Sequence, residues 1–484
     1  MRLVVTSFDL QQVEHRGIAM YSKGLLKALK QSGAEIWLLT DFDPPMRGTG
    51  LSKVPAAVRE LYYQAKVLES LTAGYGSLFA PWAAMKMAEK NRIIKNLIKL
   101  WIFIQGVPSK VLIKRRYRLN NLRKINLHDL HDSPYERQER LSYLENLDGI
   151  ICARHLYLNV FKSALMRKQT PVKIELGGFD ALVTTAPLNV KTDRKNSLVQ
   201  SIHDLIPIEY TETTDHVGVF SKRMLSCVDA KRLFVSASAK DKFDRVFCGE
   251  QQHEGTIITQ PPSLVIPPGI RGQIFKHETL RPSRGTNKEI GTLHAFRYLL
   301  FNSSIEQRKN LLFAIKAFKN SGLPDQGIKL CVTGQLKADS YSESIRKESD
   351  ESILITGYID ETTKANLFIN SLLVISPSLV EGFGIPVLDA ACLGVPALAS
   401  PSHSHQEIKA MDDFKDLVWI CDTTKSLDWS IAMQNLAKAE LSRIKDDNGK
   451  EQERRIDRYV EKNAMIFENF RNSISSQVLK GIRS

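Results

Sequence analysis

The sequence predicts an α/β protein with two doubly wound domains, and three observations lead to this fold class. Strand-like apolar segments alternate with helix-like segments in both halves of the chain, as in parallel sheets that are covered by helices. The chain has 484 residues, which exceeds the size of one typical hydrophobic core. The proline-rich residues 260–270 separate the two alternating runs and are the best candidate for a domain boundary.

The first alternating run opens with a strand, a helix and a second strand. Leu3–Thr6 and Ile36–Thr40 are predicted strands, and Ile18–Gln31 is a predicted helix with leucines on one face, closed by Gly33. Because strand–helix–strand crossovers are right-handed, this unit predicts a parallel sheet. Further strands of this run are predicted at residues 149–152, 180–183, 197–202 and 232–235.

Residues 44–135 interrupt this pattern with helical and basic sequence, and we interpret them as an insertion. The N-terminal domain is therefore predicted to span residues 1–270, and the C-terminal domain residues 271–484. The second alternating run contains predicted strands at residues 298–302, 328–333, 353–356 and 372–375, and predicted helices at residues 311–320, 361–370 and 451–479.

The composition is ordinary for a soluble globular protein, with 43% hydrophobic and 25% charged residues. The six cysteines are scattered without a C-x-x-C pair, which favours buried thiols in a reducing compartment over disulfides or a zinc site. The N-terminus has too short an apolar run for a signal peptide, and no run approaches the roughly 20 residues of a transmembrane helix. We therefore expect a cytoplasmic protein.

Most of the net charge of +14 lies in residues 86–124, which contain twelve basic residues and one acid and so carry +11 (14 minus 11 leaves +3). The first part has helical periodicity, with Trp101 on the apolar face and Lys95 opposite. Such a helix is typical of an anchor on an anionic membrane surface. The alternative is a helix whose apolar face covers the protein's own core. We expect no nucleic acid partner, since aromatic interleaving is sparse and no such motif is present.

The most informative motif runs from Glu381 to Asp389, in E-G-F-G-I-P-V-L-D, directly after a predicted strand. It predicts a loop that opens a short helix, with Gly384 allowing backbone geometry that a Cβ would forbid. Amides at a helix start can bind a phosphate, and the two acids could accept hydrogen bonds from sugar and ribose hydroxyls. The alternative is an ordinary strand-to-helix turn with two chance acids.

Ligands of open α/β sheets bind beyond the carboxyl ends of the strands, so polar residues at these places are candidate site residues. They include cations, glycines, a histidine and carboxylates, which together suit a phosphorylated sugar held between two domains. The candidates are Arg16, Gly17, His203, Asp204, the loop 303–310, Gly334, Tyr358 and Glu381.

Five motifs together resemble those of GT-B retaining glycosyltransferases of family 4. They are R-G-I-A-M-Y-S-K-G-L-L (16–26), H-D-L-I-P (203–207), V-I-P-P-G-I (265–270), I-E-Q-R-K-N (305–310) and E-G-F-G-I-P-V-L-D-A (381–390). The resemblance covers residues 1–40 and about 180–484 and leaves out 44–135. It implies two Rossmann-like domains facing a cleft, and a last helix that crosses back to the first domain. The H-D-L-I-P and I-E-Q-R-K-N patterns resemble those of bacterial surface-polysaccharide enzymes, often mannosyltransferases that use GDP-mannose.

The resemblance implies roles for the matching positions. Lys309, with Arg308 beside it, would contact the donor diphosphate, where negative charge grows as the glycosidic bond breaks. Glu381 would hold hydroxyls of the donor sugar, and His203 would line the reaction centre. The other implied donor-site positions are Gly17 at the diphosphate, Gly334, Tyr358 and Ile359 near the nucleobase, the amides of Phe383 and Gly384 at the sugar or phosphate, and Asp389 at the ribose.

The resemblance implies front-face displacement, in which the donor phosphate helps to take the acceptor's proton, so no protein general base is assigned. It implies no metal and no cofactor other than the nucleotide sugar. Two positions depart from the family pattern: Asp389 replaces the usual glutamate, and Ser303 replaces an arginine that many relatives carry. Either departure would weaken donor binding, and the alternative that the chain is a catalytically inactive relative of these enzymes stays open.

Two histidine pairs are weaker candidates. His128 and His131 lie near acids and suggest a metal site, but no other ligand cluster accompanies them, and we prefer a surface or acceptor-side segment. His403 and His405 follow a predicted strand, and solvent exposure is the expected state of both.

The sequence thus predicts a retaining hexosyltransferase of bacterial polysaccharide synthesis. It would move a hexose, with mannose favoured, from a nucleotide diphosphate sugar, with GDP favoured over UDP, to a glycan or lipid-linked acceptor. Residues 86–124 would hold it at the inner face of the cell membrane. The alternatives are a phosphorylase or synthase of the same fold, and an inactive nucleotide-binding scaffold at the membrane.

Overall fold

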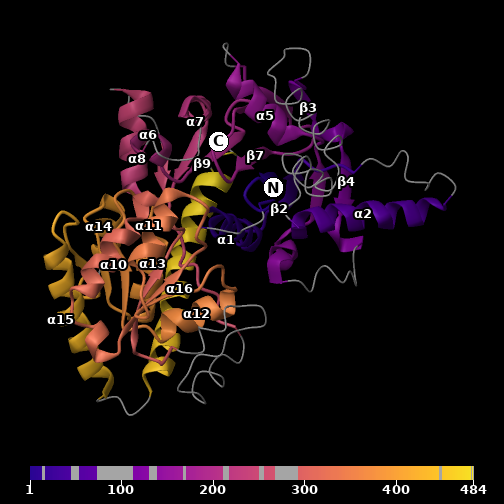
Figure 1. The fold of residues 1–484 in the computed structure, drawn as a ribbon. Helices are drawn as coiled ribbons and strands as arrows, with labels where there is room; N and C mark the ends of the chain where they lie inside the picture. Colours follow the sequence, from indigo (N-terminus) through magenta and orange to yellow (C-terminus); the bar gives the residue numbers. More distant parts are fainter. Residues whose placement is uncertain are drawn as a thin grey trace, which may run out of the picture. The chain divides into compact units, whose positions relative to one another are not determined.

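The structure is a computed structural model, and it forms two compact units (Figure 1). The first unit consists of Met1–Val235, Ala239–Thr259 and Phe467–Ser484, and the second of Ser236–Ser238 and Gln260–Ile466. The chain therefore enters the second unit at Gln260, ahead of the boundary predicted at residue 270. The residues described are 1–12, 17–44, 54–73, 113–129, 139–166, 170–210, 217–249, 255–267, 293–411, 413–445, 450–480 and 482.

The first unit contains an eight-stranded sheet in the order β11-β10-β9-β7-β1-β2-β5-β4. All neighbours are parallel except β4 and β5. The strands are β1 (Arg2–Thr6), β2 (Glu35–Thr40), β4 (Arg123–Asn126), β5 (Gly149–Cys152), β7 (Ala181–Thr184), β9 (Leu198–Ile202), β10 (Lys231–Phe234) and β11 (Gly255–Ile257). A separate sheet joins β3 (Arg116–Arg118), β6 (Val172–Glu175) and β8 (Val190–Thr192).

The first helix of this unit is α1, and its leucines are buried as its periodicity predicts. After α1, Gly33 adopts a left-handed conformation with a φ of 82°. The α-helices are α1 (Gly17–Gln31), α2 (Ala56–Ala73), α5 (Leu156–Leu165), α6 (Ile206–Glu209), α7 (Val217–Leu225) and α8 (Ala237–Phe243). Shorter helical turns are η2 (Leu119–Asn121), η3 (Leu127–Asp129), η4 (Glu139–Asn146) and η5 (Asp244–Cys248).

The prediction that residues 44–135 form a helical insertion is correct for α2 and wrong for β3 and β4. β3 pairs with β6, and β4 pairs with β5 at the edge of the large sheet. Tyr117 and Ile125 are buried while their neighbours are exposed or half-buried, which is the two-residue period of a strand. These strands are too short for that period to stand out in a basic sequence.

The basic residues of this segment that the structure describes are engaged within the first unit. Arg116 and Arg118 both form ion pairs with Glu175, at 3.1 Å and 2.8 Å. Arg123 pairs with Glu60 and lies over the ring of Tyr63. The membrane interpretation therefore loses support at residues 114–124, whereas residues 86–112 lie outside the described part of the chain.

The second unit contains a fully parallel six-stranded sheet in the order β14-β13-β12-β15-β16-β17. Its strands are β12 (Tyr298–Asn302), β13 (Lys329–Thr333), β14 (Ile353–Ile355), β15 (Leu373–Ser376), β16 (Ala397–Ala399) and β17 (Val418–Ile420). Its helices and helical turns are η7 (Gln307–Lys309), α10 (Leu311–Lys319), η8 (Pro324–Gln326), α11 (Ser340–Glu348), α12 (Glu361–Ile369), α13 (Ile385–Leu393), α14 (His403–Lys409) and α15 (Ser426–Lys445).

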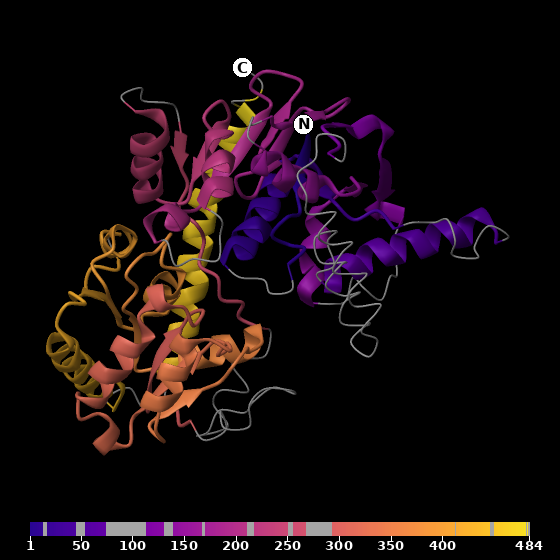
Figure 2. The same ribbon diagram turned by 45° about the horizontal axis from the view of Figure 1, so that its top comes forward.

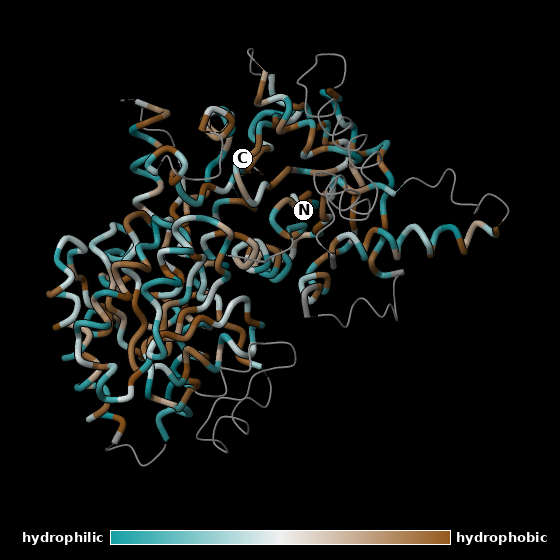
Figure 3. The backbone as a smooth tube through the Cα atoms, in the orientation of Figure 1, coloured by the Kyte–Doolittle hydropathy of each residue, from teal (hydrophilic) through white to brown (hydrophobic). Residues whose placement is uncertain are grey.

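The core of the second unit lies between this sheet and the helices that cover it. Leu299, Phe301 and Val332 on the strands pack with Phe318 of α10 and Trp429 of α15, all nearly or fully buried. Figure 3 shows hydrophobic and hydrophilic residues mixed along the chain of this unit. Among the described helices, none is both long and apolar enough to cross a lipid bilayer.

The last long helix, α16 (Glu451–Ile474), belongs to both units and is yellow in Figure 2. From Phe467 onward its residues group with the first unit, where Phe470 packs edge-on against Tyr21 and is almost fully buried. η9 (Ser475–Lys480) continues it.

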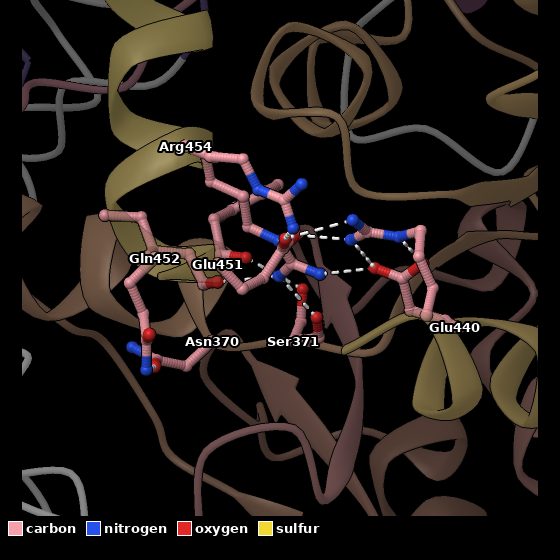
Figure 4. Close-up of polar contacts among 10 residues, drawn as sticks. Asn370, Ser371, Glu440, Glu451, Gln452 and Arg454 are labelled. Carbon is pink, nitrogen blue, oxygen red and sulfur yellow. Dashed lines mark hydrogen bonds and ion pairs between the residues drawn. The ribbon is translucent and has the colours of Figure 1, made fainter. Parts of the chain in front are cut away.

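The start of α16 is fixed to the second unit by Arg455, whose side chain is 1% exposed. Its guanidinium pairs with Glu440 and Glu451, both at 2.6 Å, and donates to the carbonyls of Ile369 and Ser371. Figure 4 shows this network, with Glu440 and Glu451 directed toward one another. With an acceptor at each of its three nitrogen atoms, this cation can be buried.

Candidate functional site

The sheet of the second unit reverses its strand order between β12 and β15. β13 and β14 follow β12 on one side, and β16 and β17 follow β15 on the other. The loops after β12 and β15 therefore begin side by side at the carboxyl edge. In open α/β sheets this switch point is where ligands bind. Lys309 lies in the first of these loops and Glu381 in the second.

The structure brings Lys309 and Glu381 into direct contact. The Lys309 Nζ donates to Oε1 of Glu381 at 2.5 Å, and the two side chains are only 9% and 8% exposed. The backbone joins the same loops, since the amide of Leu379 donates to the carbonyl of Arg308 at 2.8 Å. The short helical turn η7 ends at Lys309, and Asn310 in a left-handed conformation then opens α10.

The environment of Glu381 holds its carboxylate in the charged form. Burial alone would raise the pKa of Glu381, but the charges of Lys309 and Arg308 lower this pKa to about 2. Ser378 Oγ donates a further hydrogen bond to the same carboxylate oxygen at 2.8 Å. Burial lowers the pKa of Lys309, and Glu381 opposes that effect. The site thus holds one buried carboxylate and one buried ammonium group.

Arg308 extends across the same two loops. Its Nε donates to Oε2 of Glu306 at 2.9 Å, and a terminal nitrogen lies 3.5 Å from the carbonyl oxygen of Val380. Its side chain is 17% exposed, so the guanidinium is more accessible than the ammonium group of Lys309. The two cations beside Glu381 therefore differ: Lys309 is buried against the carboxylate and Arg308 lies nearer the surface.

The loop that carries Glu381 ends at Gly384, the residue before α13, which has a φ of 90°. A Cβ at this position would lie 2.7 Å from Cδ2 of His405, so both the backbone conformation and the packing require glycine. Phe383, just before it, is 6% exposed. The predicted loop-to-helix turn is therefore present, with its glycine at the point of closest packing.

The expectation that His405 is solvent-exposed is wrong. His405 lies on α14 and is fully buried, with Nδ1 3.0 Å from the carbonyl oxygen of Ser400 and Nε2 3.3 Å from Oγ of Ser376. Burial lowers its pKa, which favours the neutral ring. The polar S-H-S-H sequence conceals this burial, but His405 follows β16 and the strand-end rule could have found it. His403, on the same helix, is exposed, as expected.

The positions predicted near the nucleobase follow β13 and β14. Gly334 has a φ of 120°, and a Cβ there would lie 2.5 Å from the carbonyl oxygen of Ser303. Its amide donates to the carbonyl of Gly357 at 3.0 Å, which places it beside the loop of Tyr358. Tyr358 is 62% exposed, and Ile359 is half-buried. These residues share the carboxyl edge with the Lys309 loop.

Asp389 has a different set of partners from Lys309 and Glu381. It is fully buried in α13, and its two oxygens accept hydrogen bonds from the amide and the hydroxyl of Ser263, both at 2.6 Å. The predicted site residues of the second unit thus divide in two. Lys309, Arg308 and Glu381 meet at the switch point with Phe383 and Gly384 in the same loop, whereas Asp389 is engaged elsewhere.

In the first unit His203 follows β9 and is 7% exposed. Its Nε2 lies 2.7 Å from the carbonyl oxygen of Thr185, which follows β7, and the ring of Tyr21 packs edge-on against it at 4.7 Å. Asp9, after β1, accepts a hydrogen bond from Thr185 Oγ1 at 2.7 Å. Gly17 begins α1, whereas Arg16 lies outside the described residues.

Asp9 was missed by the sequence analysis, although its position after the first strand is the signal that selected the other residues. It is 5% exposed, and burial raises its pKa, while burial lowers the pKa of His203. β1 and β7 form the switch point of the first sheet. Asp9, Thr185 and His203 therefore form a buried polar group at the carboxyl edge of that sheet.

Of the two histidines considered as a metal site, the structure describes only His128. His128 is 69% exposed and lies 3.5 Å from Asp148, and His131 lies outside the described part of the chain. Throughout the ranges that the structure describes, no group of three or more histidine, cysteine, aspartate or glutamate side chains is placed to hold a metal ion.

No curated protein sequence matches the chain. Residues 286–452 match the family model described as glycosyl transferases group 1. Among solved structures, sucrose-phosphate synthase from Thermosynechococcus elongatus is 12% identical over 99% of each chain, with a TM-score of 0.55. The structure of TarM is 11% identical over 100% of this chain and 99% of its own, with a TM-score of 0.51. The predicted α/β fold of the GT-B type is thus confirmed, and the glycosyl transferases group 1 match falls on the unit that holds Lys309 and Glu381.

Proposed function

We propose that this protein is a retaining glycosyltransferase that moves a hexose from a nucleotide diphosphate sugar to a glycan or lipid-linked acceptor. The observation that carries the proposal is the buried pair of Lys309 and Glu381 at the switch point of the second sheet. It lies within the residues that match the glycosyl transferases group 1 model. The rest of the assignment follows from what such a pair can do to a sugar diphosphate.

The two charges suit the two parts of a donor. The ammonium group of Lys309 can stabilise the negative charge that grows on the departing diphosphate. The carboxylate of Glu381 stays ionised and can accept hydrogen bonds from sugar hydroxyls. α13 begins at Ile385, four residues after Glu381, and backbone amides at a helix start favour a phosphate.

The proposed reaction breaks the bond between the anomeric carbon and the phosphate oxygen and forms a bond from the same face to an acceptor oxygen. The acceptor proton passes to the departing phosphate, so no protein base is required. Lys309 and Arg308 would hold the diphosphate and Glu381 the sugar, with Phe383 and Gly384 beside them. Gly334, Tyr358 and Ile359 would lie toward the base, and Gly17 toward the diphosphate.

His203 is proposed to line the reaction centre from the first unit. Its support is a fixed ring orientation, because Nε2 lies at hydrogen-bonding distance from a carbonyl oxygen and therefore carries the proton. Nδ1 is then the acceptor nitrogen of a neutral ring, in agreement with the lowered pKa. A neutral imidazole can accept a hydrogen bond from a sugar hydroxyl.

The donor is proposed to be a GDP-hexose, with mannose favoured, in a bacterial polysaccharide pathway. The support is the I-E-Q-R-K-N and H-D-L-I-P patterns alone. A thermal-shift comparison of GDP, UDP and ADP tests the base, because the nucleotide that binds the folded chain raises its Tm by mass action. We expect the largest shift with GDP. A larger shift with UDP would move the donor to a UDP-sugar, and no shift with any of the three would contradict a nucleotide-sugar donor.

Activity is tested by the release of nucleotide from the sugar donor, with and without a glycan acceptor. Acceptor-dependent release with retained anomeric configuration is expected. Release that depends on inorganic phosphate or a sugar phosphate instead would favour a phosphorylase or synthase. A chain that binds the nucleotide and releases none with any acceptor would be an inactive scaffold.

The proposed place of action is the cytoplasmic face of an anionic membrane, through residues 86–124. The support is their charge of +11, although the described cations among them are paired within the first unit. Flotation with vesicles of neutral or anionic lipid tests this at low and high salt. Binding to anionic vesicles that weakens with salt is expected. Equal binding to both vesicle types, insensitive to salt, would contradict it.

A further inference from the structure

Both oxygens of the Asp389 carboxylate accept hydrogen bonds from Ser263. Oδ1 accepts from the Ser263 amide and Oδ2 from the Ser263 hydroxyl, each at 2.6 Å, and Asp389 is 0% exposed. A buried carboxylate requires such partners, because an unsatisfied charge in the interior is costly. Because Asp389 is 0% exposed, a ribose hydroxyl could reach this carboxylate only if residues that cover it, such as Ser263, moved away.

Ser263 belongs to a segment that we call the connector, Gln260–Leu264, which is the part of the chain that enters the second unit. Two further side chains hold it there. Lys364 of α12 donates to Oγ of Ser263 at 3.1 Å, and the hydroxyl of Tyr459 on α16 donates to the carbonyl of Leu264 at 2.9 Å. Three helices of the second unit thus hold two adjacent residues of the connector.

Asp389 also stands on the helix whose start forms part of the proposed donor site. α13 has nine residues, and Asp389 lies about one turn after Gly384. Holding Asp389 therefore restrains the start of the helix, where Gly384 already packs closely against His405. The length of the side chain matters, since one more methylene group at a fully buried position would push the carboxylate past Ser263 or displace the connector.

We propose that Asp389 is a positioning residue, which fastens the connector to α13 and so fixes the start of that helix, and does not contact the ribose of the donor. The inference rests on the proposed function only where it concerns the ribose. It gives a physical reason for aspartate at this position, since the shorter side chain matches the distance to Ser263.

The first test is a double-mutant cycle on thermal unfolding without any nucleotide, with Asp389→Ala, Ser263→Ala and the double variant. We expect Asp389→Ala to lower the Tm by roughly 5 °C and Ser263→Ala to add little to it, because the Ser263 hydroxyl has then already lost its acceptor on Asp389. Ser371→Ala is the matched control, because Ser371 is another buried serine and its hydroxyl donates to the carbonyl of Phe368, away from Asp389; it should add its full effect. Additive losses of Asp389→Ala and Ser263→Ala would overturn the proposal.

The second variant is Asp389→Glu, which also serves if Asp389→Ala does not fold. If Asp389 is a positioning residue, the longer side chain should also lower the Tm, because it overpacks a buried site. If Asp389 contacts the ribose, the longer side chain should leave the Tm unchanged and strengthen nucleotide binding, since glutamate is the residue that the resemblance places here. An Asp389→Glu variant with unchanged Tm and tighter nucleotide binding would overturn the proposal.

The third test compares GDP and UDP with their 2′-deoxy and 3′-deoxy forms, on the wild type and on Asp389→Asn. We expect the ratio of ribo to deoxy affinity to stay within about twofold between the two proteins. A tenfold fall of that ratio in Asp389→Asn would show that Asp389 does contact the ribose. Absence of any nucleotide binding to the wild type would contradict the proposed function instead, while the unfolding cycle would still decide the role of Asp389.

Discussion

The ammonium group of Lys309 and the carboxylate of Glu381 form a buried ion pair at 2.5 Å, although they stand in loops that follow different strands. Each supplies the counter-charge that the other requires in a site from which water is largely excluded. A diphosphate that binds Lys309 therefore competes with Glu381. Because of this competition, substituting Lys309 should weaken nucleotide binding, whereas substituting Glu381 should strengthen it.

Lys309→Ala should weaken binding of the donor nucleotide by roughly 1.5–3 kcal/mol, which is the size of a hydrogen bond to a charged group. Isothermal titration calorimetry with the nucleotide selected by the thermal-shift panel measures this. Lys316→Ala is the control, because Lys316 is exposed on the adjacent helix α10. An unchanged affinity in Lys309→Ala would remove Lys309 from the donor site.

Glu381→Gln should bind the nucleoside diphosphate more tightly, by about threefold to tenfold, and should turn over its sugar donor more slowly. The amide oxygen can still accept from Lys309 and Ser378, but the charge that competes with the phosphate is gone. Glu343→Gln, on an exposed position of α11, controls for the change in net charge. Weaker binding of the nucleoside diphosphate to Glu381→Gln would contradict the competition.

Glu381 should also make stability depend on pH in the acid range. Its pKa in the folded chain is about 2, below the ordinary value of 4.5, so its ionised form stabilises the fold above pH 4.5. This contribution is lost as the pH falls toward 2. Urea unfolding at several pH values between 2 and 5 should show a steeper loss for the wild type than for Glu381→Gln. Parallel curves for the two proteins would refute the assignment.

Gly384→Ala should destabilise the second unit more than Gly327→Ala does. Both glycines have a positive φ, of 90° and 71°, so both variants carry the cost of a left-handed alanine, about 1–2 kcal/mol. Only at Gly384 would the new Cβ meet a buried side chain, His405, at 2.7 Å, whereas Gly327 has no atom within 4 Å. We expect an additional loss of roughly 1–3 kcal/mol in denaturant unfolding. Equal losses would show that His405 can move aside.

Arg455→Leu should lower the free energy of unfolding by about 3–5 kcal/mol, because it leaves the carboxylates of Glu440 and Glu451 without their most buried partner. Arg454→Leu is the matched control. Arg454 also pairs with Glu451, but its side chain is 55% exposed, and a loss of no more than about 1 kcal/mol is expected. If both variants lost the same amount by urea unfolding, burial of the network would not be what stabilises α16.

The sequence analysis located the site residues whose position follows from the succession of strands and loops along the chain. Lys309 and Glu381 were found because each follows an apolar strand, and parallel strands place such residues at one edge. The partner of Asp389 could not be predicted in this way, since Ser263 is 126 residues away in sequence and the contact depends on how the connector packs.

The other differences have related causes. β3 and β4 contain three and four residues, which is too short for a two-residue period to be distinguished from a basic loop. His405 stands among serines, so its local sequence suggests a surface, and its burial arises from the packing of α14 beneath Gly384. Asp9 is a single acid after a strand, a pattern too common to select a residue without its contact to Thr185.

The shared membership of α16 has a consequence for synthesis on the ribosome. Residues 467–484 group with a unit whose other residues all precede Gln260. Phe470 and Ile474 are almost completely covered there, and Lys27 lies over the ring of Phe467. The first unit therefore cannot complete its core until the second unit has been translated. Until then, this apolar surface is exposed to water. During that interval the nascent chain carries an incomplete core, and binding of a chaperone to that surface would keep it from aggregating.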